Sequence, residues 1–589
     1  MKGWRILALG LALTLTAGCA GLPLTGPVLS QPREVDDEQG SVTVEPQPPP
    51  IGALPEMIIR GFLVAMASYE LDYATARLYL TDAAAQQWNP RSGALIYASG
   101  STPSVALSTN GAHVVMRGQQ IGQIEADGSF TVPEEGDWEH DFEMIKEDGE
   151  WRISSPPKGL VMSQFSFSQS FEPVDAYFFA ATGRNLVPDA RYLPRGAWSR
   201  TMAASIVLEG PSAWLSRIIR PAPKPHFSLD QEVGLTSDGV AEVGLPIAAK
   251  ELTPQARTDL AIEIAATMRG LPGVRAVRLL CEGEVLPLTT GPANILSISE
   301  TERFDPARNT ANPSLMWIQD NLVTTSVADT TVNIEGEWGR TPHPSRHLAA
   351  KQTQIAVVTP EGLLTGPRTD ELPLIRWEAP DLLRPQFSRG NLWVMSATGA
   401  IKVILAKSDT VVDLGHTQVA ALNSLRPGER TLQGFQISPD GQRILLITSV
   451  DQAGEEPRQE LSLALITYDE QGVPVEIRSD RPIRLTWQGE TINSIVDVAW
   501  SGPCSLLVLG GSGKNPTKLF DTDLDGIKIR DRSHPQLVRP VQMAVHTNLT
   551  GPQIAILGDD QVVWAYQEGY RWVQVATGAT AIAYPALQG

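Results

Sequence analysis

The sequence is poor in the residues from which enzymes most often build active sites. Its 589 residues include only 3 cysteines and 8 histidines. Neither a G-x-S-x-G nucleophile elbow nor an H-E-x-x-H zinc motif occurs. These absences leave little material for a general base, although a site of paired carboxylates would carry no such motif. Cys281 and Cys504 fall in separate segments, so we expect two buried free thiols rather than a disulfide.

Basic residues are also scarce. Lys and Arg total 47 against 66 Asp and Glu, which gives a formal net charge of −19. A nucleic-acid-binding protein needs a basic footprint, so the composition argues against nucleic acid as a partner. It equally disfavours broad electrostatic adhesion to anionic lipid.

Long apolar runs are missing after the N-terminus, so the sequence predicts no second membrane anchor. At the start, Lys2 and Arg5 precede an apolar run from Ile6 to Leu15, which is shorter than the roughly 20 residues of a membrane span. Small residues then lead to Cys19. This ending resembles the lipobox of bacterial lipoproteins. The alternative is an ordinary secretory signal with a chance cysteine.

The lipobox resemblance implies that residues 1–18 are a signal peptide that is cut after Gly18. Cys19 would become the N-terminus, carrying an S-diacylglyceryl group and an N-acyl group such as palmitate. Two or more acyl chains hold a protein on a membrane where one barely does. We therefore expect a lipid-anchored protein on the outer face of the cell membrane, lifted off by a Pro-rich tether over residues 19–50.

Residues 51–165 are predicted to form an α+β domain. Ile58, Phe62, Met66 and Tyr69 share one face of a helix that starts near Pro55. Two short helices follow, and then strands at 94–99, 104–107, 113–117, 121–124, 141–146 and 151–153, with a hairpin turn at 148–149. The final hairpin (KEDGEWRI, 146–153) resembles that of NTF2-like domains.

Residues 170–295 are predicted to form a small α/β domain. A hairpin joins strands around 177–179 and 186–187, and a helix covers 198–208. Thr253 as N-cap, Pro254 and then Gly270 delimit a second helix, between strands at 240–245 and 274–280. The phrases LEGPS (208–212), GVAEV (239–243) and LPGVRAV (271–277) resemble the GerMN module, an extracytoplasmic interaction domain with no hallmark catalytic residues.

Residues 310–589 read as short strands separated by turns. Five similar phrases can be aligned on Lys351, Ser388, Ser438, Ser501 and Thr547, at spacings of 37, 50, 63 and 46 residues. A loose period of about 40–50 residues is typical of a β-propeller. Five or six blades fit the length; the alternative is a pair of β-sandwiches.

Three motifs come close to a known site. Asp521, Asp523 and Asp525 begin a calcium-loop pattern, but Arg532 stands where a bidentate Glu belongs, so a solvated acidic turn is the alternative. GGSGK at 510–514 lacks the spacing of a phosphate loop. His343 and His347 are separated by Pro344, which opposes the helix that a zinc pair would need. We therefore predict no metal and no cofactor.

Taken in order, these segments resemble the actinobacterial lipoprotein LpqB family. Further matching phrases are ASY (67–69), DYATAR (72–77), YLT (79–81), WNP (88–90) and LVPDARYLP (186–194). The resemblance implies a multidomain protein with an α+β NTF2-like domain, a small α/β GerMN domain and an all-β propeller. It also implies a non-enzymatic accessory that binds the extracytoplasmic domain of the sensor kinase MtrB and modulates MtrA–MtrB signalling. The alternatives are an extracytoplasmic binder of an envelope lipid or glycan, and a propeller hydrolase with facing carboxylates.

Overall fold

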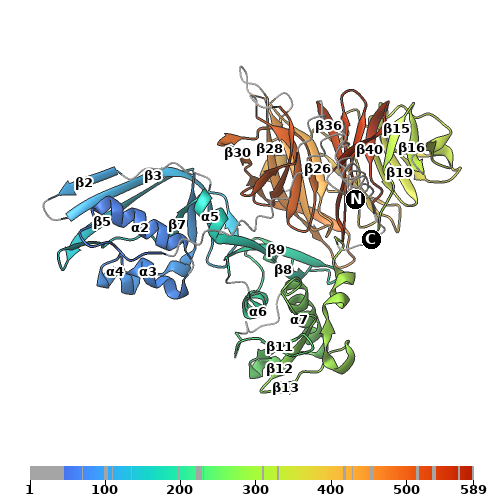
Figure 1. Ribbon diagram of the computed structural model, residues 1–589. Helices are drawn as coiled ribbons and strands as arrows, with labels where there is room; N and C mark the ends of the chain where they lie inside the picture. Colours follow the sequence, from blue (N-terminus) through green and yellow to red (C-terminus); the bar gives the residue numbers. More distant parts are fainter. Residues whose placement is uncertain are drawn as a thin grey trace, which may run out of the picture. The chain divides into compact units, whose positions relative to one another are not determined.

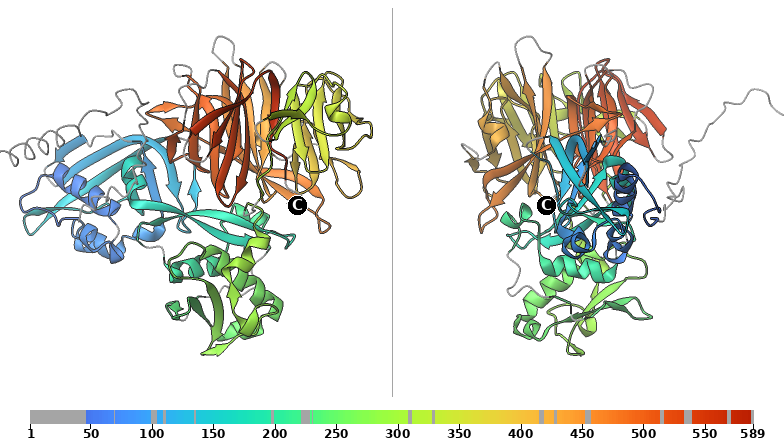
Figure 2. Two further views of the ribbon diagram at one scale, coloured as in Figure 1. Left: turned by 45° about the vertical axis from the view of Figure 1, so that its right-hand side comes forward. Right: turned by 90° about the vertical axis from the view of Figure 1, so that its left-hand side faces the viewer.

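The fold was analysed in a computed structural model (Figures 1 and 2). It describes residues 46–586, except 69, 99–103, 109–110, 134–135, 197–198, 221–227, 230, 308–310, 328–329, 415–418, 427–428, 452–456, 513–515, 533–538 and 568–570. None of the helices within these ranges has both the length and the apolar character needed to cross a membrane.

The N-terminal domain is a curved sheet with a helix packed across it (Figure 1). The sheet runs β6-β5-β3-β1-β7, and β2 and β4 pair with β3. Its helices are α2 (Pro55–Ala67), η1 (Leu71–Tyr73), α3 (Ala74–Arg77), α4 (Asp82–Gln87), η2 (Pro90–Ser92) and α5 (Gln164–Ser170). Its strands are β1 (Ala94–Tyr97), β2 (Ser104–Ser108), β3 (Gly111–Ile124), β4 (Phe130–Thr131), β5 (Asp137–Glu147), β6 (Glu150–Ile153) and β7 (Leu160–Ser163).

Most of the predicted elements of this domain are confirmed. Ile58, Phe62 and Met66 on α2 are at most 1% exposed, while Tyr69 lies outside the described residues. Asp148 and Gly149 both have positive φ, as the predicted hairpin turn requires. The prediction of separate strands at 113–117 and 121–124 was wrong. The residues between them stay extended because they pair with β5, so that β3 is one strand of 14 residues.

The second region places two helices between a long hairpin and a small sheet (Figure 1). The hairpin is β8 (Phe171–Phe179) with β9 (Leu186–Pro194), and the helices are α6 (Arg200–Glu209) and α7 (Pro254–Thr267). The sheet comprises β10 (Gly234–Leu235), β11 (Val240–Leu245), β12 (Ala276–Cys281), β13 (Glu284–Val285) and β14 (Leu296–Ser297). The 3-10 turns are η3 (Leu215–Arg217), η4 (Ile247–Glu251), η5 (Pro292–Asn294) and η6 (Ile298–Phe304).

Local signals set the ends of these helices. The Thr253 hydroxyl accepts a hydrogen bond from the Ala256 backbone N–H, as predicted for an N-cap. Gly210 and Gly270 have the positive φ that favours glycine after a helix. Because β11 and β12 pair in parallel, α7 serves as the crossover between them.

Among its described residues, the C-terminal region forms six four-stranded sheets, which confirms the predicted propeller and excludes the sandwich alternative. In blade order the sheets are β40-β15-β16-β17, β18–β21, β22–β25, β26–β29, β32–β35 and β36–β39. Contacts between the first strands of neighbouring sheets run round the complete ring, from β18 through β22, β26, β32 and β36 to β40 and back.

The strands of blades 1 to 3 are β15 (Met316–Gln319), β16 (Leu322–Val327), β17 (Thr330–Asn333), β40 (Ala579–Ala583), β18 (His347–Lys351), β19 (Gln354–Thr359), β20 (Gly362–Pro367), β21 (Leu374–Trp377), β22 (Gln386–Ser388), β23 (Asn391–Met395), β24 (Ile401–Ile404) and β25 (Val411–Asp413).

The strands of blades 4 to 6 are β26 (Arg430–Ile437), β27 (Arg443–Val450), β28 (Arg458–Tyr468), β29 (Pro474–Ile483), β32 (Ser494–Trp500), β33 (Ser505–Gly511), β34 (Lys518–Asp523), β35 (Ile529–Asp531), β36 (Pro540–Asn548), β37 (Gly551–Gly558), β38 (Val563–Gln567) and β39 (Arg571–Ala576). Outside the blades lie the short ribbon β30 (Thr486–Trp487) with β31 (Glu490–Thr491), helix α8 (Ala420–Asn423) and η7 (Glu337–Gly339).

The last strand closes the ring. β40 pairs antiparallel with β15, so that residues more than 260 positions apart complete blade 1 (Figure 1). The five anchors of the predicted repeat fall at the C-terminal ends of the innermost strands of blades 2 to 6. The sequence period therefore marks equivalent positions around the propeller axis.

Polar contacts join the three regions. The Asn185 side chain donates to the backbone carbonyl of Asp440, and the Trp214 indole donates to that of Ser479. Arg481 of blade 4 donates to the backbone carbonyl of Phe130 in the N-terminal domain. At this junction Arg443 pairs with Asp440 and donates to the Pro503 carbonyl, and both charged residues are less than 5% exposed.

The Asp440–Arg443 pair generates a prediction about stability. Arg443→Met keeps apolar volume but leaves the Asp440 carboxylate buried without a cation, so we expect a loss of about 3–5 kcal/mol. The matched control is Arg539→Met, which removes a pair whose Arg side chain is 82% exposed and should cost less than about 1 kcal/mol. Urea unfolding followed by tryptophan fluorescence measures both losses. Equal losses would show that burial of the pair is unimportant.

A partly buried acid generates a prediction about pH. Burial raises the pKa of Glu263 on α7 to about 7, while its carboxylate accepts a hydrogen bond from the Phe179 N–H and faces Asp259 and Arg220. The unfolded state therefore loses this proton first, and stability falls as the pH rises from about 4.5 towards 7. Glu263→Gln keeps the acceptor and cannot ionise, so it should raise the melting temperature more at pH 8 than at pH 4.5. An equal effect at both pH values would contradict the assignment.

Candidate functional site

The predicted lipidation site lies outside the described residues. Gly18 and Cys19 both precede residue 46, so the cleavage after Gly18 and the acylation of Cys19 stay predictions. The other two cysteines are free, as expected: Cys281 is buried, and Cys504 is partly buried against Arg443 and the Pro188 carbonyl.

The acidic turn of blade 5 is held by arginines. The Asp521 carboxylate lies 2.9 Å from the Arg532 guanidinium, the residue that breaks the calcium pattern. Asp525 lies 3.5 Å from Arg481 of blade 4, and burial raises the pKa of Asp523 to about 6. Nowhere in the described residues do three His, Cys, Asp or Glu side chains gather as metal ligands would. The turn therefore fits a structural role better than a calcium site.

The two other near-motifs also have different surroundings. His343 packs against the ring of Trp338, with 5.2 Å between ring centroids, whereas His347 begins β18. Gly510 and Gly511 end strand β33, and residues 513–515 of the glycine-rich segment lie outside the described residues.

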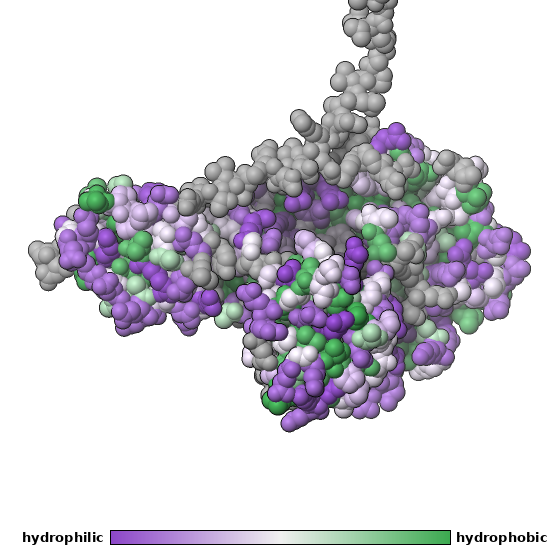
Figure 3. Space-filling view, turned by 60° about the horizontal axis from the view of Figure 1, so that its bottom comes forward, coloured by the Kyte–Doolittle hydropathy of each residue, from purple (hydrophilic) through white to green (hydrophobic). Residues whose placement is uncertain are grey.

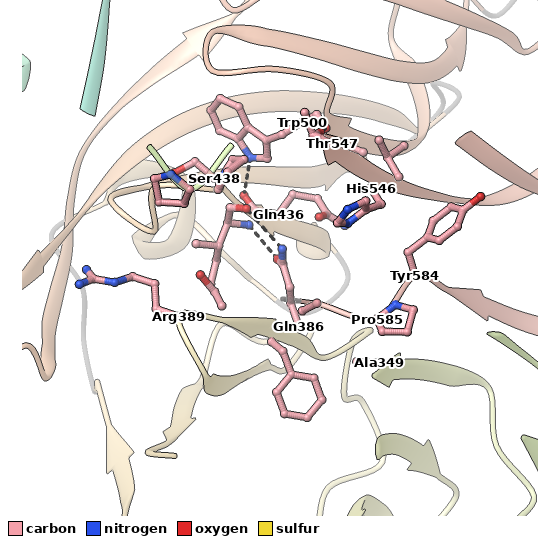
Figure 4. Close-up of a pocket in the computed structure, with 18 of the residues that line it drawn as sticks. Ala349, Gln386, Arg389, Gln436, Ser438, Trp500, His546, Thr547, Tyr584 and Pro585 are labelled. Atoms are coloured by element: carbon pink, nitrogen blue, oxygen red, sulfur yellow. Dashed lines mark hydrogen bonds between the residues drawn. The ribbon is translucent and has the colours of Figure 1, made fainter. Parts of the chain in front are cut away.

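A cavity of about 720 Å³ lies on the propeller axis (Figure 4). The innermost strands of all six blades line it, and three repeat anchors, Ser388, Ser438 and Thr547, are among the lining residues. Its volume lies in the range of small-molecule sites. The hairpin tip at Arg184 and Asn185 and the end of η6 also line it, so the second region forms part of its wall.

Side chains in this wall join neighbouring blades. The Gln386 amide donates to the Ile437 carbonyl and accepts from the Ile437 N–H, and the Trp500 indole donates to the Gln436 carbonyl (Figure 4). The Thr547 hydroxyl donates to the Trp500 carbonyl. These hydrogen bonds fix the polar atoms of the wall in place.

An ion pair crosses the channel towards the N-terminal ends of the inner strands. Arg384, just before β22, lies 2.8 Å from the Asp497 carboxylate of β32 and also donates to the Met543 carbonyl of β36. Blade 3 is thereby tied to blades 5 and 6. Burial and the charges of Arg384 and Arg346 lower the pKa of His347 to about 4, so this imidazole is neutral at physiological pH.

The opposite end of the cavity is cationic. Its lining includes Arg184, Arg303, Arg389 and Lys407, and within the described residues none of these four lies within ion-pair distance of a carboxylate. Asp305 is the one carboxylate among the described lining residues, and it is paired with Arg269 at 2.6 Å. Two facing carboxylates, which the hydrolase alternative requires, are therefore not present in this described lining.

A second cavity of about 530 Å³ lies where the three regions meet. Its lining includes Asp127 and Phe130 from the N-terminal domain, Asp189 from β9, and Arg443 and Arg481 from the propeller. Arg191, which is 1% exposed, pairs with Asp189 and donates to the Asp127 backbone carbonyl. The charged side chains around this cavity pair with one another, so the cavity is mainly part of the interface between the three regions.

Sequence reasoning identified the ring but not the side chains that line its axis. The repeat was the signal in the sequence that could have located the cavity lining, because the residues at and just before its anchors end the inner strands. The cationic lining could not be predicted in this way, since Arg184 and Arg303 come from the second region and Lys407 lies in the turn between β24 and β25.

The family described as "Lipoprotein LpqB, N-terminal domain" matches residues 48–168, and "Lipoprotein LpqB beta-propeller domain" matches residues 320–587. A lipoprotein LpqB of Cutibacterium acnes is 26% identical, with 99% of each chain covered. That of Mycolicibacterium smegmatis is 25% identical, again with 99% of each covered, and that of Bifidobacterium longum is 31% identical over 47% of this chain and 50% of its own.

Solved structures resemble the chain only weakly. A chain of a nidogen/laminin complex is 10% identical with a TM-score of 0.31, and covers 46% of this chain and 98% of its own length. The periplasmic gluconolactonase of Pseudomonas aeruginosa is 13% identical with a TM-score of 0.30, and covers 46% and 99%. The sequence relatives are named as lipoproteins rather than enzymes. The length over which these relatives align and the two matched domains show that the chain belongs to the lipoprotein LpqB family.

Proposed function

We propose that this protein is a lipid-anchored, non-enzymatic accessory that binds the extracytoplasmic domain of the sensor kinase MtrB and modulates MtrA–MtrB signalling. The observation that carries the proposal is family membership along the whole chain, because relatives align over 99% of it. The GerMN resemblance of residues 170–295 supports an interaction role for the second region. The non-enzymatic assignment is supported by a cavity whose described lining holds one carboxylate, already paired.

The anchor belongs to the same proposal. Acyl chains on Cys19 would hold the body at the outer face of the cell membrane, and the Pro-rich tether would set its reach. The space-filling view in Figure 3 shows a mostly hydrophilic face with small apolar groups, which suits a body held by lipid rather than by its own surface.

The outer strand of blade 2 is the surface that we assign to the kinase. On β21, Leu374 and Ile375 are 62% and 48% exposed, and the preceding Leu372 is 72% exposed. The outer strands of the other blades carry at most one exposed large apolar side chain each among the described residues. Exposed apolar groups on an edge strand favour a protein partner, which can both cover them and pair with the free backbone.

The kinase assignment predicts a binding pattern. By isothermal titration calorimetry, the mature chain should bind the purified MtrB extracytoplasmic domain. Leu374→Glu should weaken binding by about tenfold or more, since it places a charge in an apolar contact. The control Val475→Glu changes a residue that is 55% exposed on the outer strand of blade 4, and it should bind like the wild type. Absence of binding at high concentration would refute the kinase assignment, whereas equal effects of both variants would refute only the β21 surface.

The anchor predicts a change of location. Cys19→Ser should release the protein into the medium or leave it uncleaved at the membrane, because serine offers no thiol for the diacylglyceryl group. Membrane fractionation and mass spectrometry of the N-terminus measure this, with Cys504→Ser as the control that stays anchored. A Cys19→Ser protein that is cleaved and still firmly membrane-held would contradict the lipid anchor.

A further inference from the structure

The axial cavity concentrates positive charge in an acidic protein. Among the described residues, four basic side chains that line it have no carboxylate within ion-pair distance, whereas the chain as a whole carries a formal charge of −19. They come from three separate places: the hairpin tip (Arg184), the end of η6 (Arg303) and two turns of blade 3 (Arg389 and Lys407). Convergence of like charges is unfavourable unless something else offsets it, so a negatively charged occupant is the natural complement.

Arg389 provides a second, independent observation. Its Nη1 atom is buried and has no hydrogen-bond partner among the described residues, although a buried donor normally has one. The guanidinium lies over the ring of Tyr468, with Cζ 5.1 Å from the ring centroid. In Figure 4 Arg389 lies on the side of the cavity opposite Tyr584, and its guanidinium is directed away from the other labelled side chains.

The backbone conformation at Arg389 supports the same assignment. The turn Arg389-Gly390 joins β22 to β23, and φ is +50° at Arg389 and +78° at Gly390. Hairpin turns of this kind favour Asn, Asp or Gly at the first position. An arginine held there is strained, and such strain is retained mostly where the side chain has a use.

A buried hydrogen-bond acceptor indicates which second group the ligand carries. Asn185 is 5% exposed, and its amide nitrogen donates to the Asp440 carbonyl, but its Oδ1 atom has no partner. An unsatisfied buried acceptor needs a donor such as a hydroxyl group. The two unpaired atoms are therefore complementary to an acceptor group and to a hydroxyl group.

We propose that the mouth of the axial cavity binds the phosphate ester of a sugar or polyol. Arg389, Arg303, Arg184 and Lys407 hold the phosphate, and Asn185 accepts a hydrogen bond from a hydroxyl. A phosphate supplies up to two charges and three acceptor oxygens, which matches several guanidinium groups better than one carboxylate does. The cavity of about 720 Å³ accommodates a hexose phosphate. The assignment does not depend on kinase binding.

Calorimetric titration of the mature chain tests the proposal with glucose 6-phosphate, inorganic phosphate and glucose as probes. Glucose 6-phosphate should bind, and glucose should not. Arg389→Gln, and separately the exposed pair Arg303→Gln with Lys407→Gln, should weaken binding by about tenfold or more. The control is Arg571→Gln on β39, an exposed arginine outside the cavity, which should bind like the wild type. Melting temperatures verify that each variant is folded.

The hydroxyl contact has its own variant. Asn185→Leu removes the acceptor at similar volume, together with the hydrogen bond to the Asp440 carbonyl, so it should weaken glucose 6-phosphate binding and leave inorganic phosphate unaffected while the melting temperature verifies the fold. Vesicles of phosphatidylglycerol, compared with phosphatidylcholine, distinguish a lipid headgroup from a free ester, since both present a polyol phosphate. Binding of the vesicles alone, with the same dependence on Arg389, would identify the headgroup as the source.

Three results would overturn the proposal. They are no binding of either phosphate ester, equal binding of glucose and glucose 6-phosphate, and wild-type binding by both cavity variants. Equal affinity for inorganic phosphate and glucose 6-phosphate would reduce the site to a simple anion site and remove the polyol from the assignment.

Discussion

Closure of the ring is the constraint on which the rest of the propeller depends. Neighbouring blades do not share a sheet, so something other than strand pairing must hold their inner strands together. Hydrogen bonds do this at every junction. At the three successive junctions from blade 3 to blade 6 they involve Gln386, Trp500 and Thr547. At the next junction, Gln542 of blade 6 forms hydrogen bonds with the backbone of Ile582 in blade 1. The Ala586 N–H reaches Ala350, and Lys351 reaches the Gly390 carbonyl, which completes the circle.

The same arrangement explains why a cavity persists on the axis. Side chains that bond the adjacent blade are directed around the ring, and they cannot also fill its centre. Arg384 and Asp497 cross the axis towards one end, where His347 is kept neutral. The other end is bordered by the second region. The electrostatics of the channel are therefore asymmetric, with charges paired at one end and cations lacking carboxylate partners at the other.

The sequence predicted those parts of the fold that local patterns determine. The α2 face at Ile58 and Phe62, the cap at Thr253 and the turn at Asp148 each rest on neighbouring residues, and each is confirmed. The propeller could be predicted because its repeat is itself a local pattern. The strand β3 was missed because pairing with β5, and not its own composition, keeps its middle extended.

The candidate site was harder to predict because it is assembled from distant segments. Arg184 and Lys407 are far apart in sequence, and neither belongs to a motif. The unpaired state of Arg389 depends on what surrounds it in three dimensions. The acidic turn at Asp521 shows the opposite case, since its pattern suggested a cation, whereas Arg532 and Arg481 supply the positive charge.

The pairing of β40 with β15 also sets an order of events during folding. Blade 1 lacks its innermost strand until residue 583 is available, so the ring cannot close while the chain is still emerging. The N-terminal domain, whose sheet is complete by Ser163, has no such dependence and can fold as it emerges. Blades 2 to 6 are each built from consecutive strands and need no later segment, so the position left unfilled during this interval lies beside β15 in blade 1.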